Sequence, residues 1–475
     1  MTLWLGVENF GKIKEARICI NKFTVLVGPN NCGKSFLMQL ADGINDYFMT
    51  LDEVVDITPF LVEEKEGIQE YSISHANCVE LVTAINETLV LQKENAIKSI
   101  LGKEVAIGKL YIDLEMDESE EYQVLAIDLK KAPLTQIEKR MPYRDKFIDN
   151  ILKSPQASGD GGLGGSLVLL SEYNPENNTK RLRYASNSSV PLNKNMVQRV
   201  ITRGVFSTNS LYMPSSRNGL LLLYRDFFAN RADHTFEFNL NYHDEVVETI
   251  KADSGLTKPI YKFLRFLQTY SYVENEREKK DLEFFNQQII EGNIAVNEQG
   301  VFSYQSEQDK LSVPMYLASS MINELVPLHL ALTTRLRYRR LVIDEIESSL
   351  HPQKQMEVVR LLNRLNNSGY QFIISTHSDT IASEISNLSR LSVAKIGREQ
   401  LESIGLEEKD IIKPENLYVY EFHVGEDGRS VVQEVRNSQS GYQFELFTNS
   451  ALQLYMESKK IGEILSKDDN KPETI

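Results

Sequence analysis

The sequence predicts an α/β fold whose core is a mostly parallel sheet. Phe23–Val27 is a short apolar run typical of a buried parallel strand, and a glycine-rich turn and a helical pattern follow it directly. Two further apolar runs, Arg340–Glu345 and Gln371–Ser378, end in polar residues and are separated by one helical segment. Strands and helices that alternate in this way form parallel sheets, because each strand needs a helical crossover to reach the next.

Length and charge limit the classes of protein to consider. The chain has 475 residues, enough for two or three domain-sized units, and 52 Lys and Arg against 67 Asp and Glu give a net charge of −15. An acidic chain has no overall attraction for nucleic acid, so DNA binding would need a local basic groove. Cys19, Cys32 and Cys78 form no C-x-x-C pair, which excludes a cysteine zinc hook. With no apolar run long enough for a membrane helix, we expect a cytoplasmic protein.

The remaining elements are predicted from apolar periodicity. Runs that alternate or cluster predict strands at Leu3–Val7, Ala16–Ile20, Ser166–Leu170, Arg181–Ala185, Leu417–Val424 and Ser430–Val435, and hairpins at Val105–Leu114 with Tyr122–Leu129 and at Ile294–Tyr304. Spacing of three and four residues predicts helices at 36–50, Cys78–Leu101 and Asp281–Ile290, and a mainly helical stretch over 195–290.

These elements suggest three regions. Residues 1–50 and 310–440 form a head, and residues 51–309 form an insertion with β-hairpins over about 104–186 and helices over about 195–290. The insertion is a candidate for assembly and partner binding. Residues 441–475 form a C-terminal helix and a polar tail, frayed from residue 462. Within the insertion, Ala157–Ser166 is glycine-rich, but no Gly-Lys-Ser/Thr closes it, so a flexible loop is preferred over a second phosphate loop.

The turn after the first parallel strand carries the strongest chemical signal. Its eight residues are Gly28, Pro29, Asn30, Asn31, Cys32, Gly33, Lys34 and Ser35, which fit G-x-x-x-x-G-K-[ST] at every fixed position. Backbone N–H groups and the positive end of the following helix favour a phosphate there. Lys34 can reach the β- and γ-phosphates of ATP, and the Ser35 hydroxyl can ligate Mg²⁺.

Two other strand ends supply the remaining candidates. Asp344 can hold Mg²⁺ and Glu345 can orient and polarise the attacking water, although two solvated acids that cap a strand are the plain alternative. His377 follows the next strand and could donate a hydrogen bond to the γ-phosphate or to the water. The alternative is that His377 is a structural residue, but its position one strand after the acidic pair favours a role in the site.

These motifs together resemble a known family. GPNNCGKS, LVIDEIESSLHP and FIISTHSD, in this order, look like the ABC-type ATPases of the Rad50, RecF and SMC group. The LHP after the acidic pair and YMPSSRNGL at 212–220 resemble more narrowly the OLD-like ATPases of the AAA15/AAA21 type in bacterial anti-phage defence loci, among which the ATPase subunit of PARIS-type systems is similar in size. The resemblance implies an ABC-type ATPase head, with a RecA-like core, an antiparallel β subdomain and a largely helical insertion.

The resemblance also implies a site shared between two copies. Members of this group engage ATP between protomers, with a signature motif from one facing the phosphate loop of the other. The matching stretch is Pro314–Leu325, in which Ser319 or Ser320 would cap a helix aimed at the γ-phosphate. Met321 stands where a glycine is usual. Ser349–His351 would lie in the loop that signals across the dimer, and Arg217 is a candidate coupling residue near the phosphates with no defined role.

Three functions compete for these residues. The first is a slow ATPase switch that uses Mg²⁺ and ATP, dimerises or forms a larger ring, and captures or releases a separate effector such as a nuclease or toxin, with a phage protein as trigger. The second is a DNA-repair or chromosome-binding clamp of the RecF or Rad50 kind. The net charge of −15 and the lack of a zinc hook and of a coiled-coil pattern count against it. The third is a nuclease built on His243–Glu245, a cluster more typical of a solvated helix face.

Overall fold

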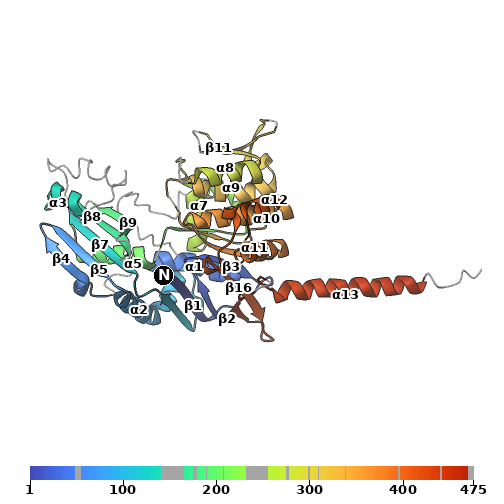
Figure 1. Cartoon of the computed structure of the whole chain (residues 1–475), viewed down its shortest axis with the longest axis horizontal. Coiled ribbons are helices and arrows are strands. Elements are labelled where there is room, and N and C mark those ends of the chain that lie inside the picture. The colour runs from blue at the N-terminus through green and yellow to red at the C-terminus, as the bar shows by residue number, and fades with distance from the viewer. Residues whose placement is uncertain are drawn as a thin grey trace, which may run out of the picture.

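The core of the protein is a nine-stranded mixed sheet (Figure 1). The computed structural model describes residues 1–48, 55–140, 165–174, 179–188, 190–206, 208–231, 255–273, 278–297, 300–308, 310–336, 338–393, 396–438 and 441–468. In spatial order the strands are β10 (Ser210–Met213), β14 (Arg340–Ile343), β15 (Gln371–Thr376), β3 (Phe23–Val27), β16 (Leu417–Val424), β17 (Ser430–Glu434), β2 (Ile13–Cys19), β1 (Thr2–Phe10) and β6 (Lys109–Glu115).

The sheet has a parallel half and a mostly antiparallel half. The strands from β10 to β16 all run parallel to their neighbours. β17 returns antiparallel to β16 and pairs in parallel with β2, and β1 and β6 complete the sheet as antiparallel strands. The predicted α/β class with a mostly parallel core is therefore confirmed.

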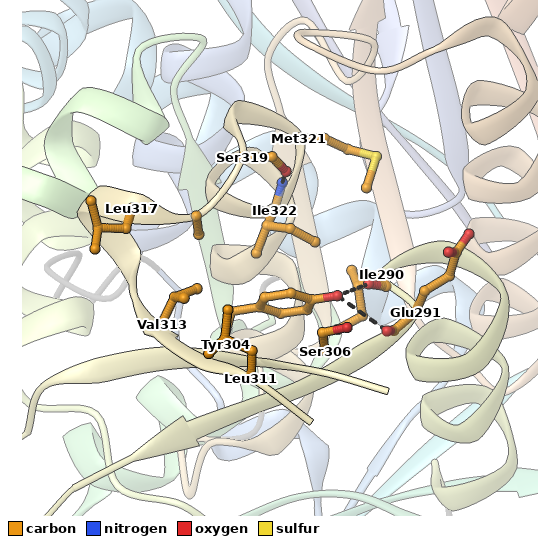
Figure 2. Close-up of a pocket in the computed structure, with 11 residues that line it drawn as sticks. Ile290, Glu291, Tyr304, Ser306, Leu311, Val313, Leu317, Ser319, Met321 and Ile322 are labelled. Atoms are coloured by element: carbon orange, nitrogen blue, oxygen red, sulfur yellow. Dashed lines mark hydrogen bonds between the residues drawn. The ribbon is translucent and has the colours of Figure 1, made fainter. Parts of the chain in front are cut away.

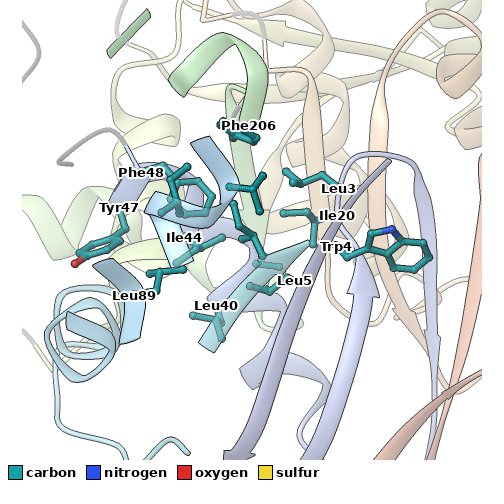
Figure 3. Close-up of a cluster of buried hydrophobic side chains, with 14 of the residues drawn as sticks. Leu3, Trp4, Leu5, Ile20, Leu40, Ile44, Tyr47, Phe48, Leu89 and Phe206 are labelled. Carbon is teal, nitrogen blue, oxygen red and sulfur yellow. The ribbon is translucent and has the colours of Figure 1, made fainter. Parts of the chain in front are cut away.

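The parallel half is buried on both faces, which explains why its strands read as continuous apolar runs. In β3, Phe23, Val25 and Val27 belong to one hydrophobic cluster and Leu26 to the other. Figure 3 shows part of the second cluster, in which side chains of β1 and α1 pack together. This two-sided burial fixes the sheet firmly beneath the loops that follow its strands.

Helices cover the sheet and build a lobe above it (Figure 1). The helices α1, α2 and α5 contribute to the cluster that contains Leu26, and α7, α9, α10 and α11 contribute to the other. Their bounds are α1 (Lys34–Phe48), α2 (His75–Leu101), α3 (Leu134–Arg140), α5 (Lys194–Phe206), α6 (Arg217–Arg231), α7 (Lys258–Gln268), α8 (Lys279–Phe284), α9 (Ser320–Thr333), α10 (Pro352–Asn367), α11 (Asp379–Leu391), α12 (Arg398–Ser403) and α13 (Glu445–Asp468), and a π-helical turn, Phe285–Ile289, continues α8. No helix among the described residues has the length and apolar composition needed to cross a bilayer.

A second sheet of five antiparallel strands lies beside the first. Its order is β4 (Leu61–Lys65), β5 (Ile68–Ile73), β7 (Glu121–Asp128), β8 (Ser166–Asn174) and β9 (Thr179–Ser188). The hairpin predicted from Val105–Leu114 and Tyr122–Leu129 is wrong, because β6 pairs with β1 in the large sheet whereas β7 pairs with β5 and β8. The connection between β6 and β7, residues 116–120, therefore joins two different sheets.

A third, small sheet confirms the other predicted hairpin. β11 (Gly292–Val296) and β12 (Phe302–Ser306) pair antiparallel, and β13 (Ser312–Pro314) joins β12 just before α9. The helical stretch predicted over 195–290 contains α5 to α8, but it also contains β10, which the pattern does not predict. β6 and β10 both belong to the large sheet, so the predicted insertion 51–309 contributes two strands to the core.

The C-terminal region differs from its prediction in one respect. α13 projects away from the rest of the molecule (Figure 1) and stays helical to Asp468, so the frayed tail predicted from residue 462 is wrong for residues 462–468. After His377 the chain forms α11 and α12 as well as the predicted β16–β17 hairpin. The predicted loop at 157–164, the cluster His243–Glu245 and residues 469–475 lie outside the described residues.

Candidate active site

Three neighbouring parallel strands end at the same edge of the large sheet. Ile343 of β14 is paired with Ile374 of β15, and Thr376 of β15 is paired with Val27 of β3. The residues that follow these strands therefore emerge side by side, at the carboxyl edge where open α/β sheets bind ligands. Those residues begin the phosphate loop, the acidic pair and the segment of His377.

The phosphate loop has the backbone shape that its glycines allow. Asn31 and Gly33 have φ angles of 61° and 105°, and α1 begins at the next residue, Lys34. A Cβ on Gly28 would lie 2.6 Å from Cβ of Phe422 on the neighbouring β16, so the strand packing requires glycine here. Asn30 and Asn31 are not buried, which leaves the outer side of the loop open.

Lys34 lies across the mouth of this loop. Its ammonium donates hydrogen bonds to the carbonyl oxygens of Gly28 and Pro29, both at 2.9 Å. Burial lowers the pKa of the Lys34 ammonium, and nearby acidic groups oppose this effect. Phosphate oxygens are stronger acceptors for a buried cation than neutral carbonyls. The arrangement is suited to an exchange of these two carbonyls for a phosphate.

Asp344 is buried and held by two hydroxyl groups. The Tyr212 hydroxyl donates to Oδ2 at 3.0 Å, and Ser375 Oγ on the adjacent β15 donates to Oδ1. The Asp344 N–H donates to the carbonyl of Met213 at 2.9 Å, which anchors the backbone to β10. These donors fix the direction of the carboxylate, as partners of a metal ligand do.

Glu345 has an unusual backbone conformation. Its φ angle is 48°, a region that costs a residue with a side chain about 1–2 kcal/mol. Ser375 Oγ accepts the Glu345 N–H at 2.8 Å, so one hydroxyl contacts both acidic residues. The Glu345 residue is partly exposed and remains open to solvent. A carboxylate in this position can orient a water molecule.

His377 lies in the same electrostatic environment. Burial lowers the pKa of the imidazole, and the positive charge of Lys34 lowers it further, so the ring is neutral near pH 7. Its backbone N–H donates to Glu347 Oε1 at 2.5 Å. Asp344 and Glu345 act electrostatically on both Lys34 and His377, and all four residues follow strands that end side by side at one edge of the sheet.

Ser35 and Asp344 are the residues that could hold a magnesium ion. Both offer oxygen atoms, the ligands that Mg²⁺ prefers, and Asp344 is already oriented by its two hydroxyl donors. Within the described ranges the structure has no cluster of three or more His, Cys, Asp or Glu that could hold a metal. The donors present suit an ion that takes most of its ligands from water and from substrate phosphates.

Arg217 is an extensively bonded side chain behind the acidic pair. It is fully buried, and its guanidinium donates to the carbonyl oxygens of Asp344 at 2.6 Å and of Glu345 at 3.1 Å. On its other side it contacts Glu324 of α9. The sequence identifies Arg217 as a candidate but gives it no role. In the structure it holds the backbone of Asp344 and Glu345, which we call the acidic turn.

The two predicted signature serines lie elsewhere on the surface. Ser319 caps α9, accepting the Ile322 N–H at 3.3 Å, and Ser320 is the first residue of the helix. Both are exposed. Among the described residues, no hydrogen bond or ion pair joins either serine to Lys34, Asp344 or His377.

A pocket of about 310 Å³ adjoins this signature segment (Figure 2). Tyr304 forms one wall, and its hydroxyl donates to the carbonyl of Ile290 at 2.8 Å with the carbonyl of Glu291 as a second acceptor at 3.1 Å. Ser319 and Met321 lie on the opposite side, as Figure 2 shows. Beside the pocket, Tyr316 and Leu317 are 73% and 65% exposed.

Sequence reasoning missed Tyr212 and Ser375. Tyr212 stands in the YMPSSRNGL segment that carries part of the family resemblance, but its strand β10 is not predicted by the pattern. Ser375 is the only polar residue between Gln371 and Thr376, and a polar residue inside a buried strand is a signal for a specific partner.

The central part of the chain is similar to one described family. Residues 180–383 match a family described as "AAA domain, putative AbiEii toxin, Type IV TA system". The match includes the acidic pair and His377 but not the phosphate loop, which lies N-terminal to it. A search of curated proteins finds no significant match. The family match and the motifs support an ATPase of the AAA/ABC type.

Among solved structures, heads of SMC proteins are similar at low levels. The SMC head domain from Thermotoga maritima is 12% identical, with a TM-score of 0.32, over 92% of this chain and 98% of that one. An Smc head from Pyrococcus furiosus, bound to the C-terminal domain of ScpA, is 12% identical, with a TM-score of 0.34, over 96% and 98% of the two chains. The order and direction of the strands in the large sheet define the fold.

Proposed function

We propose that this protein is an ATP-driven switch in which two copies close on Mg²⁺-ATP and reopen after hydrolysis. The single observation that supports this most is the meeting of Lys34, Asp344, Glu345 and His377 at one edge of the parallel sheet. A phosphate-binding lysine, a magnesium carboxylate and a carboxylate for water are the parts that phosphoryl transfer requires.

Each residue has a defined task in this proposal. The loop N–H groups and Lys34 bind the β- and γ-phosphates, and Ser35 with Asp344 would hold Mg²⁺, which neutralises charge on the phosphates when bound. Glu345 orients the attacking water and accepts its proton. The neutral His377 ring donates a hydrogen bond to the γ-phosphate. Tyr212 and Ser375 keep Asp344 in place.

The signature segment completes the site from a second copy. Ser319 and Ser320 present a helix start and two hydroxyl groups at the surface, where an anion is favoured. The exposed Tyr316 and Leu317 beside them would be covered when two copies meet. ATP would then be held between the phosphate loop of one copy and the signature helix of the other.

We further propose that closure captures or releases a separate effector protein in anti-phage defence. This step rests on the resemblance to OLD-like ATPases and on the matched family, whose description names a toxin of a type IV TA system. The net charge of −15 suits a protein partner better than duplex DNA.

ATP turnover by purified protein tests the chemical part of this proposal. We expect Glu345→Gln to bind ATP with unchanged affinity and to lower kcat by at least about 100-fold, because the water loses its base. Glu399→Gln, an exposed acid on α12, is the matched control and should turn over normally. Unchanged turnover in Glu345→Gln would remove Glu345 from its role.

A gel-shift titration at about 0.15 M salt separates the switch from the clamp, because phosphate contacts make DNA binding strongly salt-dependent. Weak or absent DNA binding by the chain alone supports the switch. Tight binding would favour the DNA clamp.

A further inference from the structure

The Arg217 guanidinium joins the signature helix to the acidic turn. Its Nε lies 3.0 Å from both the carbonyl oxygen and Oε2 of Glu324 in α9. Its Nη1 and Nη2 donate to the carbonyls of Asp344 and Glu345 at 2.6 and 3.1 Å. Arg217 and Glu324 are 1% and 6% exposed, so these contacts form without competition from solvent.

The partner in α9 is placed to sense the start of that helix. Glu324 is four residues after Ser320, so the two lie on the same face of α9, one turn apart. In an α-helix the N–H of Glu324 bonds to the carbonyl of Ser320, so one backbone hydrogen bond ties the two positions together. A contact that shifts or orders Ser320 therefore acts on Glu324 and on the guanidinium that it holds.

The partner at the other end is placed to respond. Glu345 has a φ angle of 48°, and such a conformation persists only where the surroundings hold it. Three groups hold it here: Ser375 Oγ accepts the Glu345 N–H, and both Arg217 and the Ser348 N–H donate to the Glu345 carbonyl, each at 3.1 Å. Arg217 is the one of the two carbonyl donors that comes from outside this turn. If Arg217 moves, the Glu345 carbonyl loses that donor and the backbone can shift, which would turn the carboxylate away from the water.

We infer that Arg217 is a positioning residue that transmits engagement of the signature helix to Glu345, so that hydrolysis follows closure. The inference rests on the proposed function, since it gives a route by which a second copy at the signature face controls the water-activating carboxylate. Arg217 contacts the backbone of the acidic pair and acts through Asp344 and Glu345.

A double-mutant cycle tests this coupling. We expect Ser320→Ala and Arg217→Lys each to lower kcat by about tenfold with nucleotide affinity within about threefold of wild type, because neither lies in the phosphate loop. Lysine keeps the charge beside Glu324 but cannot reach both carbonyls. Coupled residues give non-additive effects, so the double variant should be about as active as Arg217→Lys alone.

Arg364→Lys is the matched control. Arg364 is a buried arginine of α10 that pairs with Asp410 at 2.6 Å, away from the acidic turn. Adding Ser320→Ala to it should still lower kcat by about tenfold, as additivity at independent sites requires. If Arg217→Lys does not fold, Glu324→Gln replaces it in the same cycle, since glutamine keeps the size and the backbone contact.

The outcomes separate the two proposals. Additive losses, about 100-fold in the Ser320→Ala and Arg217→Lys double variant of an active protein, would overturn the coupling alone. An inactive wild type, or a Ser320→Ala variant with normal kcat, would overturn the composite site and the coupling with it.

Discussion

The phosphate-loop face and the signature face of this protein differ in how completely one chain builds them. At the phosphate loop, Lys34 and Asp344 are buried, and the hydrogen bonds that orient them come from the same chain. At the signature face, Ser319 and Ser320 are exposed beside an open pocket and exposed apolar side chains. The groups of the first face are oriented by contacts within one chain, whereas the second face is exposed to solvent.

This difference indicates where control can enter. A phosphate loop whose groups all come from one chain can bind nucleotide in a single copy, with Lys34 exchanging two carbonyl acceptors for phosphate oxygens. In our proposal, hydrolysis begins only after a second copy covers the signature face. The buried Arg217–Glu324 pair is the described contact that joins the two faces. Four substitutions or sets of substitutions test whether the two faces differ in this way.

The largest effect is expected at the phosphate-loop face. Lys34→Ala should weaken ATP binding by about 100-fold or more, because it removes the ammonium group that would bind the phosphate oxygens. Titration of a fluorescent ATP analogue measures it. Lys103→Ala, an exposed lysine outside the site, is the control and should bind normally. Retained affinity in Lys34→Ala would count against the site.

The next effect concerns the groups that hold Asp344. Tyr212→Phe and Ser375→Ala should each raise the Mg²⁺ concentration needed for half-maximal turnover by about tenfold, as loss of a partner of a metal ligand does. Tyr420→Phe, which removes a buried hydroxyl bonded to Cys19 on the same sheet, is the matched control. A Mg²⁺ dependence unchanged by all three would show that Asp344 does not bind the ion.

A smaller effect is expected at the signature face. Leu317→Ser should weaken ATP-dependent dimerisation by about fivefold, because it removes an apolar contact at the interface while nucleotide binding to one copy stays normal. Sedimentation velocity with Mg²⁺-ATP gives both masses. Val62→Ser, similarly exposed on β4 of the five-stranded sheet, should dimerise as wild type does, and equal losses in both variants would contradict the proposed interface.

The last prediction concerns protein stability and not activity, and it is made for His329 of α9. Burial lowers the pKa of His329 from 6.5 to about 4, so between these values the unfolded chain binds a proton that the folded one does not. Stability should therefore fall as pH drops from about 7.5 to about 5.0, by about 2 kcal/mol from this residue. Urea unfolding of wild type and His329→Gln at both pH values measures it, and an equal pH effect in both would exclude His329 as the cause.

The residues of the phosphate-loop face could be predicted because local sequence patterns define them. An apolar strand followed by Gly28–Ser35, or by Asp344 and Glu345, is enough to place these residues at the edge of a parallel sheet. Tyr212 and Arg217 could not be given their roles in this way. The Tyr212 hydroxyl meets Asp344 across 132 residues of sequence, and such a contact depends on which strands become neighbours.

Strand pairing is also where the fold prediction failed. β6 and β7 are adjacent in sequence and both alternate, which predicts a hairpin. Alternation fixes which face of a strand is buried but does not choose its partner. β6 is instead the edge strand next to β1, and the 51–309 segment crosses into the core twice. The head and the insertion remain useful regions, but the sheet does not separate them at those boundaries.

Complementation between two inactive variants tests the central claim most directly. Lys34→Ala and Ser320→Arg should each abolish turnover, the first at the phosphate loop and the second by blocking the signature face. Mixed in equal amounts, they should recover activity, because half of the dimers then contain one intact site made from the wild-type loop of one copy and the wild-type signature of the other. A mixture as inactive as its components, or a fully active Ser320→Arg variant, would contradict a nucleotide site shared between two copies.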